Sequence, residues 1–93
     1  RRHPITRRKI LYVSPGYVMR INELEQTESD DLLEELFEHA LNPAYQYRHK
    51  WQVNMLLGID NRASMHAAVD DYTEPRRMLR MIVGNTERVS RAA

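Results

Sequence analysis

The chain has 93 residues, enough for one small domain, and its 14 Lys and Arg against 13 Asp and Glu leave a formal net charge of +1. This balance argues against a dedicated binder of nucleic acid, and the absence of cysteine excludes disulfides, thiolate zinc sites and a cysteine nucleophile. No apolar stretch is long enough to cross a membrane, and no signal peptide is visible. We therefore expect a soluble, cytoplasmic protein.

The clearest predicted element is an amphipathic helix over residues 27–41. Either Thr27 or Ser29 can cap its first turn with a side-chain oxygen, and Pro43 disfavours helical geometry in the residue before it. Glutamates occupy the opposite side from an apolar stripe with helical spacing. The stripe consists of Leu32, Leu33, Leu36, Phe37, Ala40 and Leu41.

Short runs of strand-forming residues lie on both sides of this helix, separated by turn signals such as Ser14-Pro15-Gly16. They indicate an α+β, mainly β fold class. Five short strands and one helix close poorly by themselves, because the helix needs an apolar partner surface and the strands leave open edges. We therefore expect part of a larger fold. The predicted strands are 10–13, 17–21, 45–51, 55–60 and 76–83.

One histidine and two arginines form the most specific constellation. His66 follows a predicted buried strand, and Arg76 and Arg77 come ten and eleven residues later on the next one. A protonated imidazole would repel a neighbouring guanidinium. The pair is reasonable if the imidazole is neutral and binds a metal, while the guanidinium holds an anion on the same metal.

Three signatures in a fixed order resemble those of one enzyme family. They are Phe37-Glu38-His39 followed by Asn42-Pro43 and residues 45–51, then Asp60-Asn61-Arg62-Ala63-Ser64-Met65-His66, then Pro75-Arg76-Arg77. Together they resemble the C-terminal portion of the taurine dioxygenase and (2,4-dichlorophenoxy)acetate dioxygenase family (TauD/TfdA). The resemblance implies a double-stranded β-helix, or jelly-roll, domain portion over residues 1–86 with a polar tail at 87–93.

The resemblance also implies residue roles. His66 matches the distal histidine of a 2-His-1-carboxylate iron site, and Arg77 matches the arginine that pairs with the far carboxylate of 2-oxoglutarate. Asp60, Asn61 and Arg62 match the loop that holds the metal-bearing strand in place.

Strand parity bears on the choice between the two arginines. Arg77 shares its predicted face with three apolar residues, whereas Arg76 shares the other face with Arg80. We therefore expect Arg77 to point inward. A slip of one residue would exchange the faces and make Arg76 the ligand.

Some positions depart from the family pattern. Ile59 stands where a Trp is usual, and Met81 falls near an arginine that taurine dioxygenase uses for its sulfonate, so taurine is not the expected substrate. Tyr17 and Met81 are the candidate substrate-lining residues. No histidine is followed two residues later by Asp or Glu. The family's His-x-Asp motif must then lie in an N-terminal half of the same enzyme, which we expect as the partner of this chain.

The function implied by the resemblance is an Fe²⁺- and 2-oxoglutarate-dependent dioxygenase. Such an enzyme oxidises a small organic substrate, usually by hydroxylation, with release of succinate and CO₂. The chain would supply one metal ligand and the 2-oxoglutarate arginine, and would be inactive alone. A homo-oligomer is also compatible with the sequence. The alternative is a non-catalytic α+β module that binds an acidic partner through the basic residues 1–9 and the aromatic segment 45–51.

Overall fold

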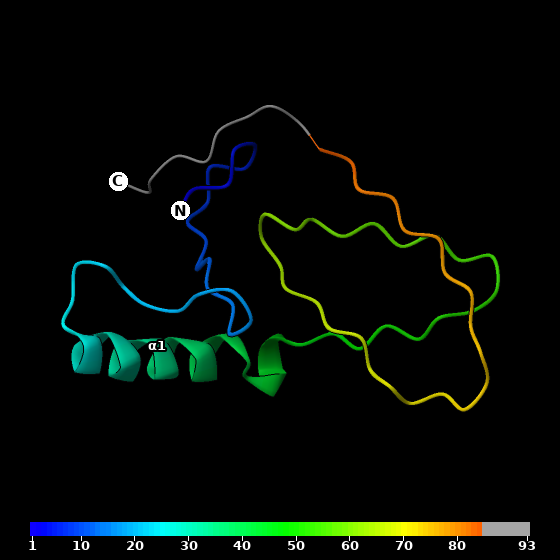
Figure 1. Ribbon diagram of the computed structural model, residues 1–93. Helices are drawn as coiled ribbons and strands as arrows, with labels where there is room; N and C mark the ends of the chain where they lie inside the picture. Colours follow the sequence, from blue (N-terminus) through cyan, green and yellow to red (C-terminus); the bar gives the residue numbers. More distant parts are fainter. Residues whose placement is uncertain (85–93) are drawn as a thin grey trace.

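The computed structural model describes residues 1–84. Its regular elements are the helix α1 (Gln26–Ala40) and the short 3₁₀ helix η1 (Pro43–Tyr45). Figure 1 shows α1 along one side of the molecule, with long extended segments before and after it. Among the described residues no helix is long and apolar enough to cross a membrane. The expected boundary at residues 86–87 and the polar tail at 87–93 lie outside the described residues.

The predicted helix is confirmed, with each end one residue earlier than expected, but the predicted caps are wrong. The N-cap is Glu25, which makes no capping hydrogen bond with its side chain. Ser29 is fully buried instead, and its Oγ accepts a hydrogen bond of 2.7 Å from the backbone N–H of Ile21. The hydroxyl therefore fastens the preceding segment onto α1 rather than satisfying the first turn of the helix.

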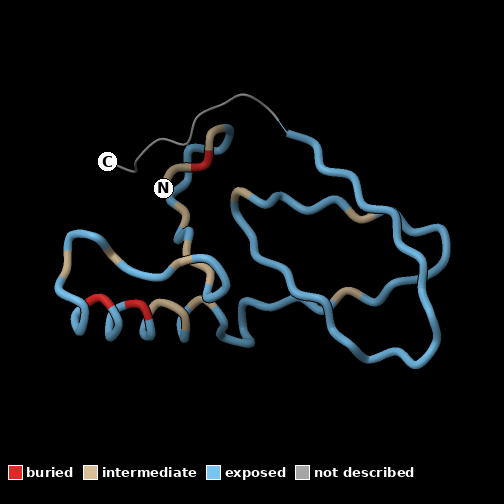
Figure 2. The backbone as a smooth tube through the Cα atoms, viewed as in Figure 1, coloured by how far each residue is buried: buried red, intermediate tan, exposed pale blue. Residues whose placement is uncertain are grey.

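The apolar stripe of α1 is buried at its centre and exposed at its edges. Leu33 is 5% exposed and is the one buried apolar residue within residues 1–84. Leu36 and Phe37 are half-buried, while Leu32 and Leu41 at the borders of the stripe lie in solvent. Figure 2 shows how little else in the described chain is buried.

None of the five predicted strands pairs into a sheet within residues 1–84, so these predictions are wrong for the described structure. Tyr45 lies in η1, and the one β-bridge there, Arg2 with Lys9, is isolated. A strand is stable only when its N–H and C=O groups pair with a neighbour and one face is covered. The segments 55–60 and 76–83 lack such a partner among the described residues, and their side chains are largely exposed: Leu56 and Leu79, for example, are 98% and 96% exposed.

The predicted turn at Ser14-Pro15-Gly16 is confirmed, because turns depend on local chemistry. At Ser14-Pro15-Gly16 the carbonyl of Ser14 accepts from the N–H groups of Tyr17 and Val18, at 3.1 and 2.9 Å. A bend also occurs at Thr73 and Glu74, before Pro75. Proline and glycine therefore interrupt the chain where the sequence indicates.

We expect the isolated 93-residue chain to show no cooperative thermal transition. Burial of apolar surface contributes about 25 cal/mol per Å², whereas ordering the backbone costs about 1–2 kcal/mol per residue. One buried apolar side chain in the described part cannot offset that cost. Differential scanning calorimetry of the purified chain checks this, with the full-length protein as the control that melts cooperatively. A heat-absorption peak from the isolated chain would contradict the expectation.

Candidate functional site

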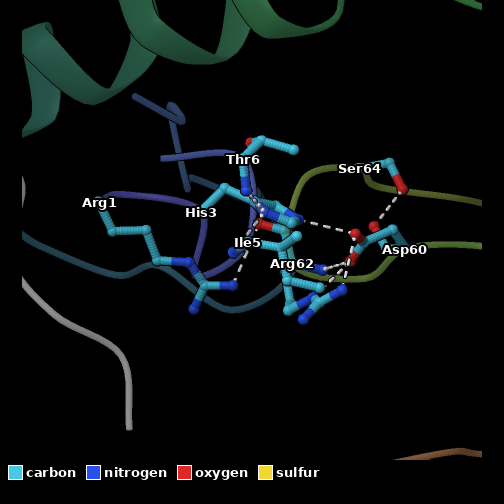
Figure 3. A network of polar contacts seen from close by, with 7 residues as sticks. All are labelled: Arg1, His3, Ile5, Thr6, Asp60, Arg62 and Ser64. Atoms are coloured by element: carbon cyan, nitrogen blue, oxygen red, sulfur yellow. Dashed lines mark hydrogen bonds and ion pairs between the residues drawn. The ribbon is translucent and has the colours of Figure 1, made fainter. Parts of the chain in front are cut away.

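The described chain gathers its densest polar contacts around Asp60, in a turn that we call the 60–64 loop (residues 60–64). Asp60 Oδ1 accepts from the backbone N–H of Arg62 at 3.0 Å and from its Nε at 2.9 Å, and Oδ2 accepts from Nη2 of the same arginine at 3.1 Å. Oδ2 also lies 2.8 Å from His3 Nε2 (Figure 3). The Asp60 carboxylate therefore binds both to Arg62 in its own turn and to His3 near the start of the chain.

The backbone of Asp60 closes the same turn. Its carbonyl accepts from the N–H groups of Ala63 and Ser64 at 3.2 and 3.1 Å. It also accepts from Ser64 Oγ at 2.7 Å. An aspartate that binds the backbone two residues on is a common turn former, so the local sequence favours this conformation without help from elsewhere.

His3 is the long-range partner of the 60–64 loop, and it is only 5% exposed. Its Nδ1 accepts from the backbone N–H groups of Ile5 and Thr6, at 3.2 and 3.1 Å. Because Nδ1 is an acceptor, the ring proton lies on Nε2, and Nε2 donates to the carboxylate of Asp60.

The segment around His3 is a small hairpin formed by residues 1–10. The N–H of His3 donates to the carbonyl of Arg8 at 2.9 Å, and the N–H of Ile10 donates to the carbonyl of Arg1 at 2.7 Å. The hairpin touches the 60–64 loop a second time, through Arg1 Nη2, which donates to the carbonyl of Arg62 at 3.1 Å. The basic opening of the sequence is thus tied to the rest of the chain rather than extended as a free arm.

The charges in this cluster hold the pKa of Asp60 well below its usual range. The hydrogen bonds from the Arg62 side chain are the main cause, and the bond from His3 comes next. The side chain of Asp60 is 41% exposed, so solvent screens these interactions. At neutral pH the acceptor for His3 and Arg62 is therefore a carboxylate.

Sequence reasoning identified Asp60 and Arg62 but missed His3. The available signal was His3-Pro4, in which a side chain able to accept hydrogen bonds precedes a turn at residues 4–6. Nothing local could show that Asp60, 57 residues further on, would be its partner. Of the predicted loop residues, Asp60 and Arg62 are brought together, while Asn61 is exposed beside them.

The other predicted site residues, His66, Arg77, Tyr17 and Met81, are all exposed. No hydrogen bond, ion pair or ring contact joins His66 or Arg77 to another residue in the range 1–84. A shallow hollow lies over residues 71–76, and His66 is not part of its lining. The structure therefore does not bring His66 and Arg77 together as a finished site.

The neighbouring Arg76 has its own partner. Its guanidinium carbon lies 4.7 Å from the centre of the Tyr72 ring, within the range of a cation–π contact. A second contact in this region is the ion pair between Arg48 and Asp71, at 2.8 Å between Nη2 and Oδ2, with both side chains exposed. The two adjacent arginines thus differ in their surroundings.

An iron site of the facial-triad kind needs three protein donors. In residues 1–84 no three His, Cys, Asp or Glu side chains lie close enough to hold a metal ion. The ring of His66 is accessible and could serve as one ligand, but two more would have to come from elsewhere. The described residues alone therefore do not fit a complete iron centre.

Comparison with known proteins defines the class to which the chain belongs. Residues 1–82 match the profile of the family described as "Taurine catabolism dioxygenase TauD, TfdA family". The match covers most of the chain, so the chain belongs to this family. The resemblance seen in the three sequence signatures is thereby confirmed.

Among its relatives, an alpha-ketoglutarate-dependent sulfonate dioxygenase of Saccharomyces cerevisiae is 38% identical over 78% of this chain and 18% of its own length. Pentalenolactone F synthase of Streptomyces arenae is 35% identical over 88% of this chain and 27% of its own length. An alpha-ketoglutarate-dependent 2,4-dichlorophenoxyacetate dioxygenase of a Burkholderia species is 36% identical over 86% of this chain and 27% of its own length. The chain thus spans about a fifth to a quarter of these curated relatives. No solved structure gives a significant match.

Proposed function

We propose that this chain is part of an Fe²⁺- and 2-oxoglutarate-dependent dioxygenase that oxidises a small organic substrate. The observation that carries the proposal is the family match over residues 1–82, together with relatives named as alpha-ketoglutarate-dependent dioxygenases. When bound, iron and 2-oxoglutarate would allow dioxygen to oxidise the substrate, with 2-oxoglutarate itself converted to succinate and CO₂. The chain's own residues bind and orient these groups.

In this proposal His66 is a metal ligand. An accessible imidazole with no other described partner is free to donate a nitrogen lone pair to Fe²⁺. The remaining ligands come from protein outside these 93 residues, which span at most 27% of the relatives named above. The same outside segments would cover the exposed apolar side chains and pair with the extended segments to complete a jelly-roll domain.

Arg77 is the proposed partner of the far carboxylate of 2-oxoglutarate. Two observations favour it over Arg76. Arg76 already lies over the ring of Tyr72, and Arg77 has no partner among the described residues. A planar guanidinium can bind a carboxylate through two parallel hydrogen bonds, which fixes the orientation of the co-substrate.

Tyr17 and Met81 are proposed to line the pocket for the primary substrate. Both side chains are exposed in the described chain and so remain available to a ligand or to the rest of the domain. A thioether offers no charge to a sulfonate. If Met81 faces the substrate, the proposal favours an organic substrate other than taurine.

The proposal is tested on the full-length protein. Fe²⁺ is added without oxygen, then 2-oxoglutarate, and the weak visible charge-transfer band of the chelate is recorded. Succinate formation is then measured after oxygen is admitted. We expect both signals. Absence of both, together with salt-sensitive binding of an acidic protein, would instead favour the non-catalytic binding module.

A further inference from the structure

We propose that His3 is a positioning residue for the metal-binding histidine, acting through its hydrogen bond to Asp60. The inference rests on the proposed function, because it assumes that His66 binds the metal. It assigns a role to a residue that the site does not otherwise use. We call the three residues His3, Asp60 and Arg62 the clasp.

The clasp joins two segments that are 57 residues apart in the sequence. Within residues 1–10, the ring of His3 is held by hydrogen bonds to the backbone. The backbone N–H groups of Ile5 and Thr6 both point at its Nδ1, which fixes the orientation of the ring in the hairpin. The Nε2–H group then points at Asp60 Oδ2 from a side chain that is almost wholly buried. A bond held this way tethers the 60–64 loop to the hairpin.

The hydrogen bonds from Arg62 to Asp60 and the long-range hydrogen bond from His3 to Asp60 have different effects on the 60–64 loop. Arg62 satisfies Asp60 from within the loop, through its backbone N–H and its guanidinium, so the turn itself can form without His3. What His3 adds is the position of that turn relative to residues 1–10. Loss of the His3 bond should therefore leave the turn intact and free the loop to move.

The loop in turn constrains His66. Ser64 is fixed to the carbonyl of Asp60 by both its Oγ and its N–H, at 2.7 and 3.1 Å. His66 is two residues further on, and two residues reach at most about 7 Å. Movement of the 60–64 loop would therefore shift the imidazole relative to the other ligands. Groups that orient a metal ligand typically change metal affinity by about 10–100-fold when they are lost.

A matched pair of substitutions at position 3 separates the hydrogen bonding of Nδ1 within the hairpin from the hydrogen bond of Nε2 to Asp60. An asparagine places its carbonyl oxygen near the position of Nδ1, so His3→Asn can keep the turn with Ile5 and Thr6 but cannot reach Asp60. A glutamine places its amide nitrogen near the position of Nε2, so His3→Gln can keep the bond to Asp60 but not the turn. Arg48→Ala is the control, because it removes a different long-range polar contact on the surface.

The measurement is Co²⁺ binding to the full-length protein, followed by the visible absorption of the metal without substrate. Thermal melting of the metal-free protein is recorded for each variant. We expect His3→Asn to weaken Co²⁺ binding by about 10–100-fold, as for other groups that orient a metal ligand. His3→Gln and Arg48→Ala should stay close to the unmodified protein. A merely structural role would lower the melting temperature of both position-3 variants and leave Co²⁺ affinity unchanged, which would overturn the proposal.

Two further measurements keep the outcomes distinct. If His3→Asn does not fold, Ser64→Ala tests the connection between the 60–64 loop and His66. It removes the 2.7 Å hydrogen bond from Ser64 Oγ to the carbonyl of Asp60. It should weaken Co²⁺ binding, and an unchanged affinity would contradict the proposal. His66→Ala tests the underlying function. If it binds Co²⁺ like the unmodified protein, the proposed function fails. If it loses Co²⁺ but His3→Asn does not, the clasp proposal alone fails.

Discussion

Replacement of His66 by alanine in the full-length protein is expected to abolish 2-oxoglutarate-dependent turnover and to weaken Fe²⁺ binding by more than about 100-fold. The loss should exceed that for a residue which merely orients a ligand, because on the proposed function the variant removes one of only three protein donors to the metal. Anaerobic titration with Fe²⁺ in the presence of 2-oxoglutarate measures the affinity, and succinate release measures the turnover.

His49→Ala is the matched control for this prediction. Its ring packs edge-on against Trp51, with 4.8 Å between the ring centroids, and it is half-buried rather than presented to solvent. We expect this variant to lose some stability and to keep its Fe²⁺ affinity. Equal losses of affinity in the two variants would contradict a specific role for His66.

Replacement of Arg77 by alanine is expected to raise the KM for 2-oxoglutarate by about 10–100-fold and to affect Fe²⁺ binding little. A hydrogen bond to a charged group contributes about 1.5–3 kcal/mol, and about 1.4 kcal/mol corresponds to a tenfold change. Steady-state kinetics with varied 2-oxoglutarate and saturating Fe²⁺ measure the effect.

Arg76→Ala is the comparison, since it removes the same charge one residue away. It should lose the contact with Tyr72 and change the KM for 2-oxoglutarate by at most about fivefold, because an exposed cation–π contact is worth only about 0.5–1 kcal/mol. A larger effect at position 76 than at 77 would show that the strand register is shifted by one residue. Equal effects would refute the assignment of either arginine as the specific ligand.

Helix α1 shows what could be predicted from local sequence. The spacing of its apolar residues determines which face turns inward, and Leu33 is indeed buried at the centre of the stripe. The cap prediction failed because a hydroxyl near a helix start has two uses. The Ser29 hydroxyl could accept a hydrogen bond from the first turn of its own helix or from a neighbouring segment. Because the backbone N–H of Ile21 lies beside it, the hydroxyl accepts from that group.

The strand predictions failed for a different reason. The preference of residues 55–60 or 76–83 for extended structure is local, but a sheet requires a second chain segment at the correct register. Residues 1–84 do not supply that partner, so the segments stay unpaired and their apolar side chains exposed. The inward face assigned to Arg77 depends on the same pairing and therefore stays a prediction.

Family membership could be read from the order and spacing of motifs such as Asp60-Asn61-Arg62 and Pro75-Arg76-Arg77, and the amphipathic helix and the turns could be read in the same way. These features depend on residues that are neighbours along the chain or on patterns that can be matched directly. The burial of His3 and its bond to Asp60 could be known only from the folded chain, because the energy of that bond depends on two groups brought together from distant parts of the sequence.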